Sequence, residues 1–526
     1  MARRCNQTGG GAGLPGMSGT TTAPGHAGTS ARPPDEAVRG RFVRMAASVT
    51  CLGLALGGCA SFSPDAGLSV AGGYAALELR KDIVKADDQG VAPSADARVD
   101  ALLRRPLTAD GAVQVALLRN RGLQAAFNDL GVSEAQYVQA TLPPSPRLSI
   151  TQWGLGFNTE IERAVAASVL ELATLPVRAE IARQRFTADQ YNAAEQVLRL
   201  AGEARRQFYR TVAANQATAF LEQALAGAES ASTLAKQLGE TGALNKLEQA
   251  REHAFYSELG AQLAKARVQQ RAERERLTRL LGLWGRDIDF RLPNGLPPLP
   301  GRLVDGRAIE AEAMSKRADV QAARFELQSL VGQFGLNQAS GFVSVFDAGF
   351  ANRFSRSRTA GGEGSAPKVD KASLNGFSAD LVIPIYDFGA TAVRGAQESY
   401  LASANRLAER AVNARSEVRE AYQRYRGQFD ITRHYQTSVL PLRRTIQDQA
   451  LLQYSGMLLD VTTLIVDARA RILSNIQAIE AQRDFWIAAT DLKAATVGGG
   501  FSGGNFGGEA AGGTPGTSLA VATPGG

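Results

Sequence analysis

The hydrophobic pattern of the chain changes its period within residues 376–425. From Phe377 to Ile385 the apolar residues alternate with polar or small residues such as Asp380, which is typical of a β-strand with one apolar face. After Gly389 apolar residues recur every seven positions in two rows that lie four residues apart, and this predicts a long helix with a coiled-coil-like seam. A strand that leads directly into a very long helix is unusual in a soluble domain, so this pattern limits the folds that the chain can adopt.

The same pattern occurs twice, because the chain contains two copies of one unit. Each copy has a helix, a pair of strands, a long helix, a glycine-containing tip and a return helix. At an offset of 197 residues Ala116 is matched by Ala313, and Gln124 is matched by Gln321. The first copy covers 106–284, with strands within 147–175 and a tip near 239–243, and the second covers 303–496, with strands within 341–387 and a tip near 456–460.

Local signals predict where single elements begin and end. Thr108 or Asp110 is expected to cap the helix that opens the first copy and runs to about residue 140. Residues 165–175 are predicted to be extended as far as Pro176, after which the long helix begins. In the second copy, residues 355–371 are predicted to form a polar loop between the strands.

Proline and glycine mark the segments that lie outside these elements. Residues 285–302 form a Pro-rich linker between the copies, and the Gly-rich tail 497–526 has no core-forming pattern and is predicted to be disordered. Residues 60–105 are interpreted as an extended tether and lead-in, with a short helix near residues 74–84. Pro441 is expected to kink its helix or to free one backbone carbonyl.

The composition favours packed helices over a nucleic-acid-binding protein. The 526-residue chain has 44% hydrophobic but only 7% aromatic residues, which suits long and closely packed helices. Its net charge of +7 is small, and its arginines are scattered among acidic residues, so solvated helix faces are favoured over a nucleic-acid surface. No continuous apolar run approaches the roughly 20 residues of a spanning helix, so a membrane role would use strands or a lipid.

An export signal precedes the first copy. Three arginines stand before an apolar stretch that ends in Leu56-Gly57-Gly58-Cys59, and this order is typical of a cleaved signal. The ending resembles the lipobox of bacterial lipoproteins, which implies that Cys59 becomes the lipidated first residue. The alanine that follows, in place of aspartate, is similar to lipoproteins of the outer membrane. The expected organisation is an extension and signal in 1–58 and a lipid-anchored tether in 59–105; an ordinary signal peptide with an incidental cysteine is the alternative.

The sequence offers little for catalysis or for a metal. It has no nucleophile elbow, no zinc-protease motif and no phosphate-binding loop. His253 and His434 lie in different predicted hairpins without a second ligand four residues away, so packing or solvent exposure is favoured over metal binding. Cleavage at Cys59 would leave no other cysteine for a disulfide or a thiolate site. We therefore expect that the chain is not an enzyme and carries no cofactor or metal apart from the covalent lipid.

Four strands with one apolar face need partners. Open strand edges invite pairing, and in a bilayer only helices and closed barrels satisfy every backbone polar group. Four strands are too few to close a barrel, so several copies of the chain are expected to contribute to one barrel. Each predicted strand has about ten residues, which is the length that a tilted membrane strand requires.

Five short motifs stand in a characteristic order along residues 106–499. They are a Leu-Thr-x-x-x-Ala opening at 107–112, a Pro-rich approach to the first strand at 142–146, the segment from Ile383 to Gly389, the segment from Tyr454 to Val461, and the closing Val497-Gly498-Gly499. In this order they resemble the TolC-type outer-membrane efflux proteins, the outer membrane factors of tripartite pumps. The resemblance implies a mainly α two-repeat protomer and a homotrimer, in which four strands from each protomer form a shared twelve-stranded β-barrel and the long hairpins form a periplasmic α-barrel.

The resemblance also implies a function, a location and partners. The chain would be a passive channel in the outer membrane of a Gram-negative bacterium, and it would export small molecules or metal ions from the periplasm. Its partners would be a periplasmic adaptor protein, an inner-membrane pump and outer-membrane lipid, with no nucleic acid. The strand end at 170–176 is similar to members associated with heavy-metal or copper export.

Site residues follow by position in the family pattern. The hairpin tips would close the periplasmic aperture and meet the adaptor. A carboxylate ring formed by Asp460 under three-fold symmetry would select cations or help to gate the pore, with a helix-capping or solvated role as the alternative. The segment between strand and helix would be the junction of the two barrels, a structural joint without chemistry. The tip residues are Gly239, Gly242, Gly456, Leu459 and Asp460, and the junction residues are Asp387, Phe388 and Gly389.

Two other functions compete with the channel. A periplasmic adaptor is also a lipoprotein with a coiled-coil hairpin, but it carries one hairpin, whereas this sequence predicts two hairpins and two strand pairs. A soluble coiled-coil scaffold would leave the apolar face from Phe377 to Ile385 and the motif at Cys59 unexplained.

Overall fold

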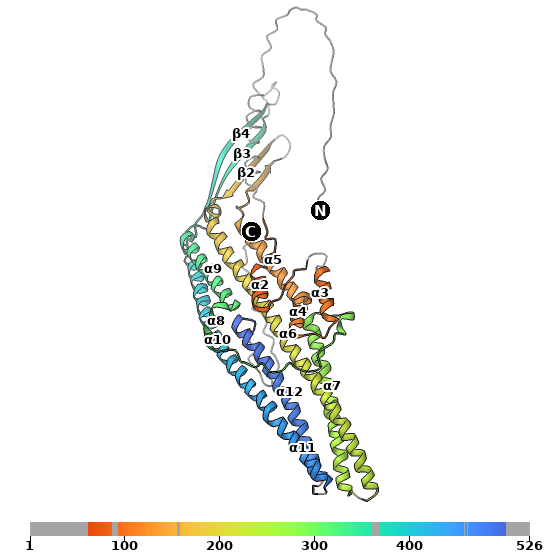
Figure 1. Ribbon diagram of the computed structural model, residues 1–526. Coiled ribbons are helices and arrows are strands. Elements are labelled where there is room, and N and C mark those ends of the chain that lie inside the picture. The colour runs from red at the N-terminus through yellow and green to blue at the C-terminus, as the bar shows by residue number, and fades with distance from the viewer. Residues whose placement is uncertain are drawn as a thin grey trace, which may run out of the picture. The chain divides into compact units, whose positions relative to one another are not determined.

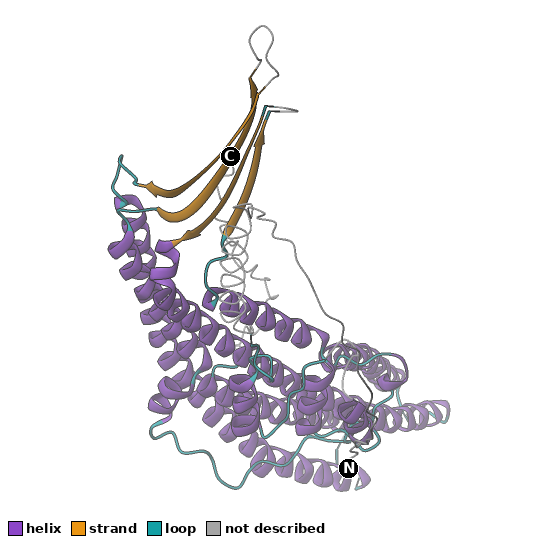
Figure 2. Ribbon diagram, turned by 90° about the horizontal axis from the view of Figure 1, so that it is seen from above, coloured by secondary structure: helices purple, strands orange, loops and turns teal. Residues whose placement is uncertain are grey.

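The strand pairs of the two copies join into one antiparallel sheet, and the long helices lead away from it (Figure 1). The computed structural model describes residues 61–86, 93–154, 158–242, 244–359, 368–456, 458–459 and 461–500. The strand order is β1-β2-β3-β4, so β2 and β3 connect the copies, and Figure 2 shows the four strands side by side in a curved sheet. The strands are β1 (Arg147–Trp153), β2 (Thr159–Ser168), β3 (Val345–Thr359) and β4 (Lys368–Val382).

The first copy follows the predicted order of elements. Thr108 caps the opening helix, as one of the two predicted alternatives, because its hydroxyl accepts the N–H of Gly111 at 3.0 Å. The long helix α6 has 72 residues, which corresponds to about 110 Å at about 1.5 Å per residue. The helices are α4 (Ala109–Arg119), α5 (Arg121–Thr141), α6 (Val169–Glu240) and α7 (Lys246–Leu281), followed by the short 3₁₀ turn η2 (Gly285–Ile288).

The second copy repeats this order with one irregular turn in its long helix. The predicted disturbance at Pro441 is confirmed, because a π-helical turn stands just before it. Proline has no N–H to donate, and in the widened turn the N–H of Leu440 reaches back to the carbonyl of Tyr435. The elements are α8 (Ile309–Lys316), α9 (Ala318–Ser340), α10 (Ala390–His434), η3 (Tyr435–Val439), α11 (Leu440–Ser455) and α12 (Val461–Val497).

Each opening helix breaks at a matching position, which corrects the prediction of one continuous helix. In the first copy the break is at Asn120, whose side chain accepts the N–H of Leu123 at 3.0 Å and donates to the carbonyl of Leu280 at 3.0 Å. In the second copy the break is at Arg317, 197 residues further on, which donates to the carbonyl of Ala495 at 3.2 Å. Both breaks therefore bind the last turns of the return helix of their own copy.

The first strand pair ends earlier than predicted. β2 ends at Ser168 and α6 begins at once, so residues 169–175 are helical and Pro176 lies inside α6. A short apolar run does not distinguish a strand from a helix by its pattern. Here the hydroxyl of Ser168 accepts the N–H of Glu171 at 3.4 Å and starts the helix.

Compared with the prediction, the second strand pair is longer at the end near the β3–β4 loop and shorter at the end near the helices. β3 and β4 continue to Thr359 and from Lys368, into the segment predicted as a polar loop, because cross-strand pairs such as Arg356 with Lys371 keep the backbone hydrogen-bonded. At the other end β3 begins at Val345 and β4 ends at Val382, so residues 383–387 lie outside the strand, and a turn at 385–389 leads to α10.

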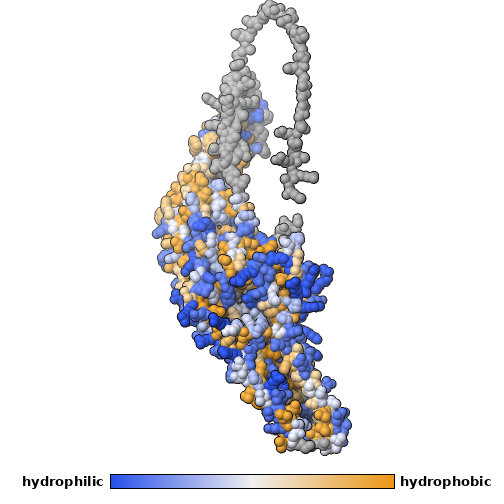
Figure 3. Space-filling model, viewed as in Figure 1, coloured by the Kyte–Doolittle hydropathy of each residue, from blue (hydrophilic) through white to orange (hydrophobic). Residues whose placement is uncertain are grey.

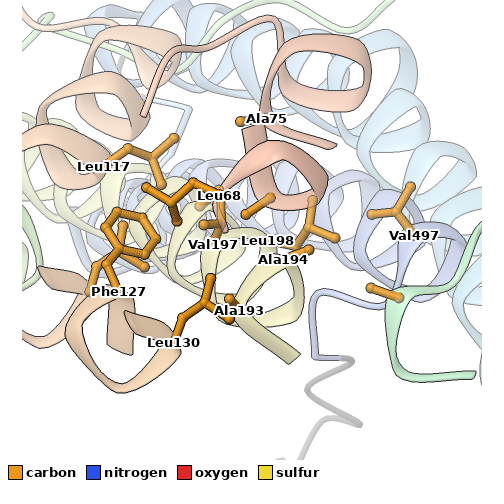
Figure 4. Close-up of a cluster of buried hydrophobic side chains, with 14 of the residues drawn as sticks. Leu68, Ala75, Leu117, Phe127, Leu130, Ala193, Ala194, Val197, Leu198 and Val497 are labelled. Atoms are coloured by element: carbon orange, nitrogen blue, oxygen red, sulfur yellow. The ribbon is translucent and has the colours of Figure 1, made fainter. Parts of the chain in front are cut away.

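The segment predicted as a tether is packed into the core of the first copy. It contains α2 (Ser69–Tyr74), a π-helical turn η1 (Ala75–Leu79) and, after residues outside the described part, α3 (Pro93–Leu103). The helical turns thus begin earlier than the predicted residues 74–84, and η1 falls within that range. Leu68, Ala71 and Ala75 are buried in a cluster with side chains of α4, α5 and α6, as Figure 4 shows for Leu68 and Ala75.

Three side chains of α4 and α5 hold this N-terminal segment by its backbone. Gln114 accepts the N–H of Asp82 at 3.2 Å and donates to its carbonyl at 2.9 Å. Gln124 accepts the N–H of Ala86 at 2.8 Å and donates to the carbonyl of Val84 at 2.9 Å. The carboxylate of Glu134 accepts the N–H of Ser63 at 2.6 Å and its hydroxyl at 2.5 Å. Residues 61–86 are therefore a fixed strap on the helices.

Candidate functional site

On one face of the sheet, one row of residues is apolar across all four strands. The register of the sheet places Leu148, Val165, Phe350 and Phe377 in this row. The rings of Phe350 and Phe377 meet edge to face with centroids 5.7 Å apart, and Phe377 is 91% exposed. An exposed apolar row of this kind suits a contact with lipid or protein.

The opposite face of the sheet is polar and charged. Arg353 bridges Glu160 and Glu162 at 3.1 Å each. Asp380 lies on this face directly across from Asp347, as the alternation of the strand predicted. The sheet therefore separates an apolar side from a side that can face water.

The joint between β4 and α10 depends on a close approach of two glycines. Gly389 has φ +79°, and a Cβ atom there would lie 2.1 Å from the carbonyl oxygen of Gly341, the residue that ends α9. Glycine is the residue that permits both the positive φ and this contact. Figure 3 shows hydrophobic residues gathered where the strands meet the helices, and those exposed there include Phe342, Ile383, Ile385 and Phe388.

The other two predicted junction residues shape the turn. Asp387 accepts the N–H of Gly389 at 3.1 Å and the N–H and hydroxyl of Thr391, so it caps the start of α10. The hydrogen bonds from the Thr391 hydroxyl, the Gly389 N–H and the Thr391 N–H lower the pKa of Asp387. Phe388 has φ +47° and is mostly exposed. The first copy lacks such a turn, since β2 passes directly into α6.

The tip of the first hairpin lies between α6 and α7. Gly242 has φ +76°, so its role in the turn is a backbone role. Gly239 lies in the last turn of α6 against the side chain of Gln249, whose Oε1 would be 2.9 Å from a Cβ atom at this position. Asn245 starts α7 by accepting the N–H of Glu248 at 2.9 Å.

The tip of the second hairpin lies between α11 and α12. Gly456 ends α11, and its N–H donates to the carbonyl of Leu452 at 3.1 Å. Its φ of −83° is open to other residues, so the turn itself does not require glycine here. Leu458 is 81% exposed beside the half-buried Leu459. Asp460 lies outside the described residues, as does Cys59.

Two cavities lie between the first hairpin and the second. One, of about 580 Å³, is near the tips and mostly apolar. The other, of about 720 Å³, lies further from the tips and has a charged lining that includes Arg210, Arg483 and Glu480. Burial lowers the pKa of Arg210. Next to the second cavity, Arg206 forms a buried ion pair with Asp491 at 2.8 Å.

The described residues contain no arrangement typical of a metal centre. In that part of the chain, three or more His, Cys, Asp or Glu side chains nowhere come together in a group that could hold a metal ion. Among its helices, none combines the length and the hydrophobicity of a membrane-spanning helix. His253 contacts Ser232 at 3.3 Å on the surface of the first hairpin.

Three residues at the joint and at the helix breaks, Gly341, Asn120 and Arg317, were not predicted from the sequence. Gly341 lies 48 positions before Gly389, and nothing in the pattern links the two. Asn120 and Arg317 could have been found from the offset of 197 residues, because both follow a matched alanine by four positions. Residues 387–389 share one turn, Gly239 and Gly242 lie at the first tip, and Gly456 lies at the second. Their roles at the junction and at the aperture stay predictions.

Comparison with known proteins gives structural matches only. No protein-family model matches this sequence, and no curated protein matches it. The Campylobacter jejuni outer membrane channel CmeC is similar with a TM-score of 0.62 and 14% identity, over 82% of this chain and 93% of CmeC. CusC, whose structures concern folding and transmembrane channel formation, is similar with a TM-score of 0.59 and 16% identity, over 74% of this chain and 91% of CusC. The Neisseria gonorrhoeae MtrE outer membrane channel, in its open state, is similar with a TM-score of 0.58 and 17% identity, over 74% of this chain and 88% of MtrE.

Proposed function

We propose that this chain, which has the fold shared by these outer-membrane channels, is itself the outer-membrane channel of a tripartite efflux system. It would pass small molecules or metal ions from the periplasm to the exterior of a Gram-negative cell. The apolar row that runs through all four strands carries this proposal, because it gives the sheet a side for lipid. The polar side with Arg353 and Asp380 then faces the passage.

The proposed assembly is a homotrimer. β1 and β4 are the edge strands of the four-stranded sheet, and each needs a partner for its free backbone groups. Three copies joined edge to edge would close a barrel of twelve strands and satisfy these groups within the bilayer. The long helices, which continue directly from the strands, would extend the passage into the periplasm.

The proposed partners act at the end away from the membrane. The hairpin tips would meet a periplasmic adaptor protein, which connects the channel to an inner-membrane pump. The glycines at 239 and 242 support this placement, since they leave short tips with few side chains. Transport through the channel itself would be passive, and the pump would supply the energy.

A charge placed on the apolar face of the sheet tests the membrane role. We expect Phe377→Arg to lose most assembled trimer from the outer-membrane fraction, because a basic side chain facing lipid costs up to about 2–4 kcal/mol. The matched control is Gly376→Arg, on the opposite face, where an added Cβ meets nothing within 4 Å. Fractionation and conductance in planar bilayers provide the measurement. Equal loss in both variants, or recovery of the unaltered protein in the soluble or inner-membrane fraction, would contradict the proposal.

We further propose a lipid anchor on Cys59. The support is the lipobox-like sequence and the strap that begins two residues later, where Ser63 is already bound to Glu134. Cys59→Ala is expected to abolish labelling with radioactive palmitate, because no acceptor thiol remains after signal cleavage. The control Cys51→Ala changes a cysteine within the signal and should keep the label. Label retained by Cys59→Ala would exclude this anchor.

A further inference from the structure

The cavity near the tips is a partly open, mostly apolar space between the two hairpins. Its volume of about 580 Å³ falls within the range of small-molecule sites. α6 and α7 form one wall, and α11 and α12 form the other. Its apolar lining includes Phe220, Leu234, Phe255, Leu451, Leu464 and Ile472.

One carboxylate lines this cavity without a hydrogen-bond donor. Glu252 of α7 is only 5% exposed, and its Oε2 atom has no hydrogen-bond partner among the described residues. Burial raises the pKa of Glu252, while the charge of Arg469 opposes this shift. Arg469 is engaged elsewhere, since it pairs with Glu258 at 3.1 Å and lies over the ring of Phe255. A buried acceptor without a hydrogen bond costs free energy, which a ligand that donates a hydrogen bond would recover.

A second acceptor lines the same cavity from the opposite wall. The Oε1 atom of Gln447, on α11, is buried and also lacks a partner among the residues that the structure describes. Both unpaired atoms are acceptors, so they call for a ligand that donates. An ammonium group has three N–H donors and no acceptor, and its charge complements a carboxylate.

We propose that this cavity binds an organic cation with an apolar body, such as a protonated primary amine with an aromatic ring. The ammonium would donate to Glu252 and Gln447, and the ring would pack among the apolar lining residues. Because Glu252 belongs to the first hairpin and Gln447 to the second, one bound cation contacts both hairpins. The inference goes beyond the proposed export function and does not depend on it.

Arg471 also lines the cavity, and its charge allows a test of where the ammonium group binds. Its positive charge repels a bound ammonium in a space with few polar groups. The ammonium end of the ligand therefore belongs with Glu252 and Gln447, and removing the charge of Arg471 should tighten binding rather than weaken it.

The test uses two fluorescent probes of nearly equal shape, 1-naphthylmethylammonium and the neutral 1-naphthylmethanol. Binding is measured by fluorescence titration on the purified full-length protein in detergent. The ammonium is expected to bind one site per chain, more tightly than the alcohol. Glu252→Gln should weaken ammonium binding about tenfold, because it removes a hydrogen bond between two charged groups, and it should weaken binding of the uncharged alcohol less. Gln447→Leu should weaken ammonium binding about threefold or more.

Two further variants complete the design. Glu229→Gln removes an exposed carboxylate of the same hairpin and should leave both affinities unchanged. Arg471→Gln should tighten ammonium binding. The proposal is overturned if Glu252→Gln and the unaltered protein bind the ammonium equally, if the alcohol binds as tightly as the ammonium, or if Arg471→Gln weakens binding. A melting curve is recorded for each variant to identify a folding defect. If Glu252→Gln does not fold, the Gln447→Leu and Arg471→Gln variants decide the outcome.

Discussion

Gly389→Ala is expected to lower the free energy of unfolding by about 3 kcal/mol and to reduce the yield of assembled protein. Two effects add at this position. Alanine is strained at φ +79°, and its Cβ would lie 2.1 Å from the carbonyl oxygen of Gly341, well inside van der Waals contact. The end of α9 and the start of α10 would have to separate, which disturbs the turn capped by Asp387. Thermal unfolding and protease resistance of the purified protein measure the loss.

Gly395→Ala is the control for this prediction. Gly395 lies in α10, six residues after the joint, and an added Cβ there meets nothing within 4 Å. Alanine in a helix interior should stabilise the chain by about 0.5–1 kcal/mol. If both variants unfold alike, the close contact between the two glycines does not hold the joint.

Arg317→Met is expected to lower the free energy of unfolding by about 3 kcal/mol, because it removes one cation from a buried network. Arg317 is 6% exposed and contacts Asp319 at 2.8 Å, Glu417 at 2.6 Å and the carbonyl of Ala495 at 3.2 Å. Burial lowers the pKa of Arg317, but the hydrogen bonds and charges of Asp319 and Glu417 raise it overall, so the guanidinium stays charged. Methionine keeps much of the volume and leaves two carboxylates facing each other.

Arg183→Met separates this effect from the loss of any arginine. Arg183 also pairs with a glutamate, Glu180 at 2.6 Å, but both side chains are more than half exposed. Exposed pairs contribute about 0–1 kcal/mol, so this variant should unfold almost as the parent protein does. Chemical denaturation of Arg183→Met and Arg317→Met in one detergent solution measures the free energy of unfolding of each variant. A change below about 1 kcal/mol for Arg317→Met would show that the network does not stabilise the break between α8 and α9.

Periodicity predicted those parts of the fold that repeat a pattern over many residues. The alternation from Phe377 identified the last part of β4, although β4 begins at Lys368 and ends at Val382, and the seven-residue repeat after Gly389 located the start of α10. The repeat of the unit predicted the second set of elements. Short segments were less predictable. Residues 169–175 have an apolar content that suits a strand or a helix, and the structure places them in α6, where the N–H of Glu171 donates to the hydroxyl of Ser168.

In the candidate site, too, some features were predictable from the sequence and others were not. Gly389 was predicted as a joint, since it stands where the period changes, but its contact with Gly341 joins residues far apart in sequence. Glu252 and Gln447 were not predicted, because a polar residue in a helical repeat is usually on a solvated face. Their burial arises from the packing of the first hairpin against the second.

The strap formed by residues 61–86 has a mechanical consequence. Gln114, Gln124 and Glu134 hold its backbone at points spread from Ser63 to Ala86, so a force applied at the N-terminal end of the strap loads the contact with Glu134 first. That load reaches α5 through Glu134 and α6 through Gln190, which donates to the carbonyl of Gly67. β1 and β4 bear none of it directly. A pull on the proposed lipid anchor would therefore strain the helices of the first copy before it could peel a strand from the edge of the sheet.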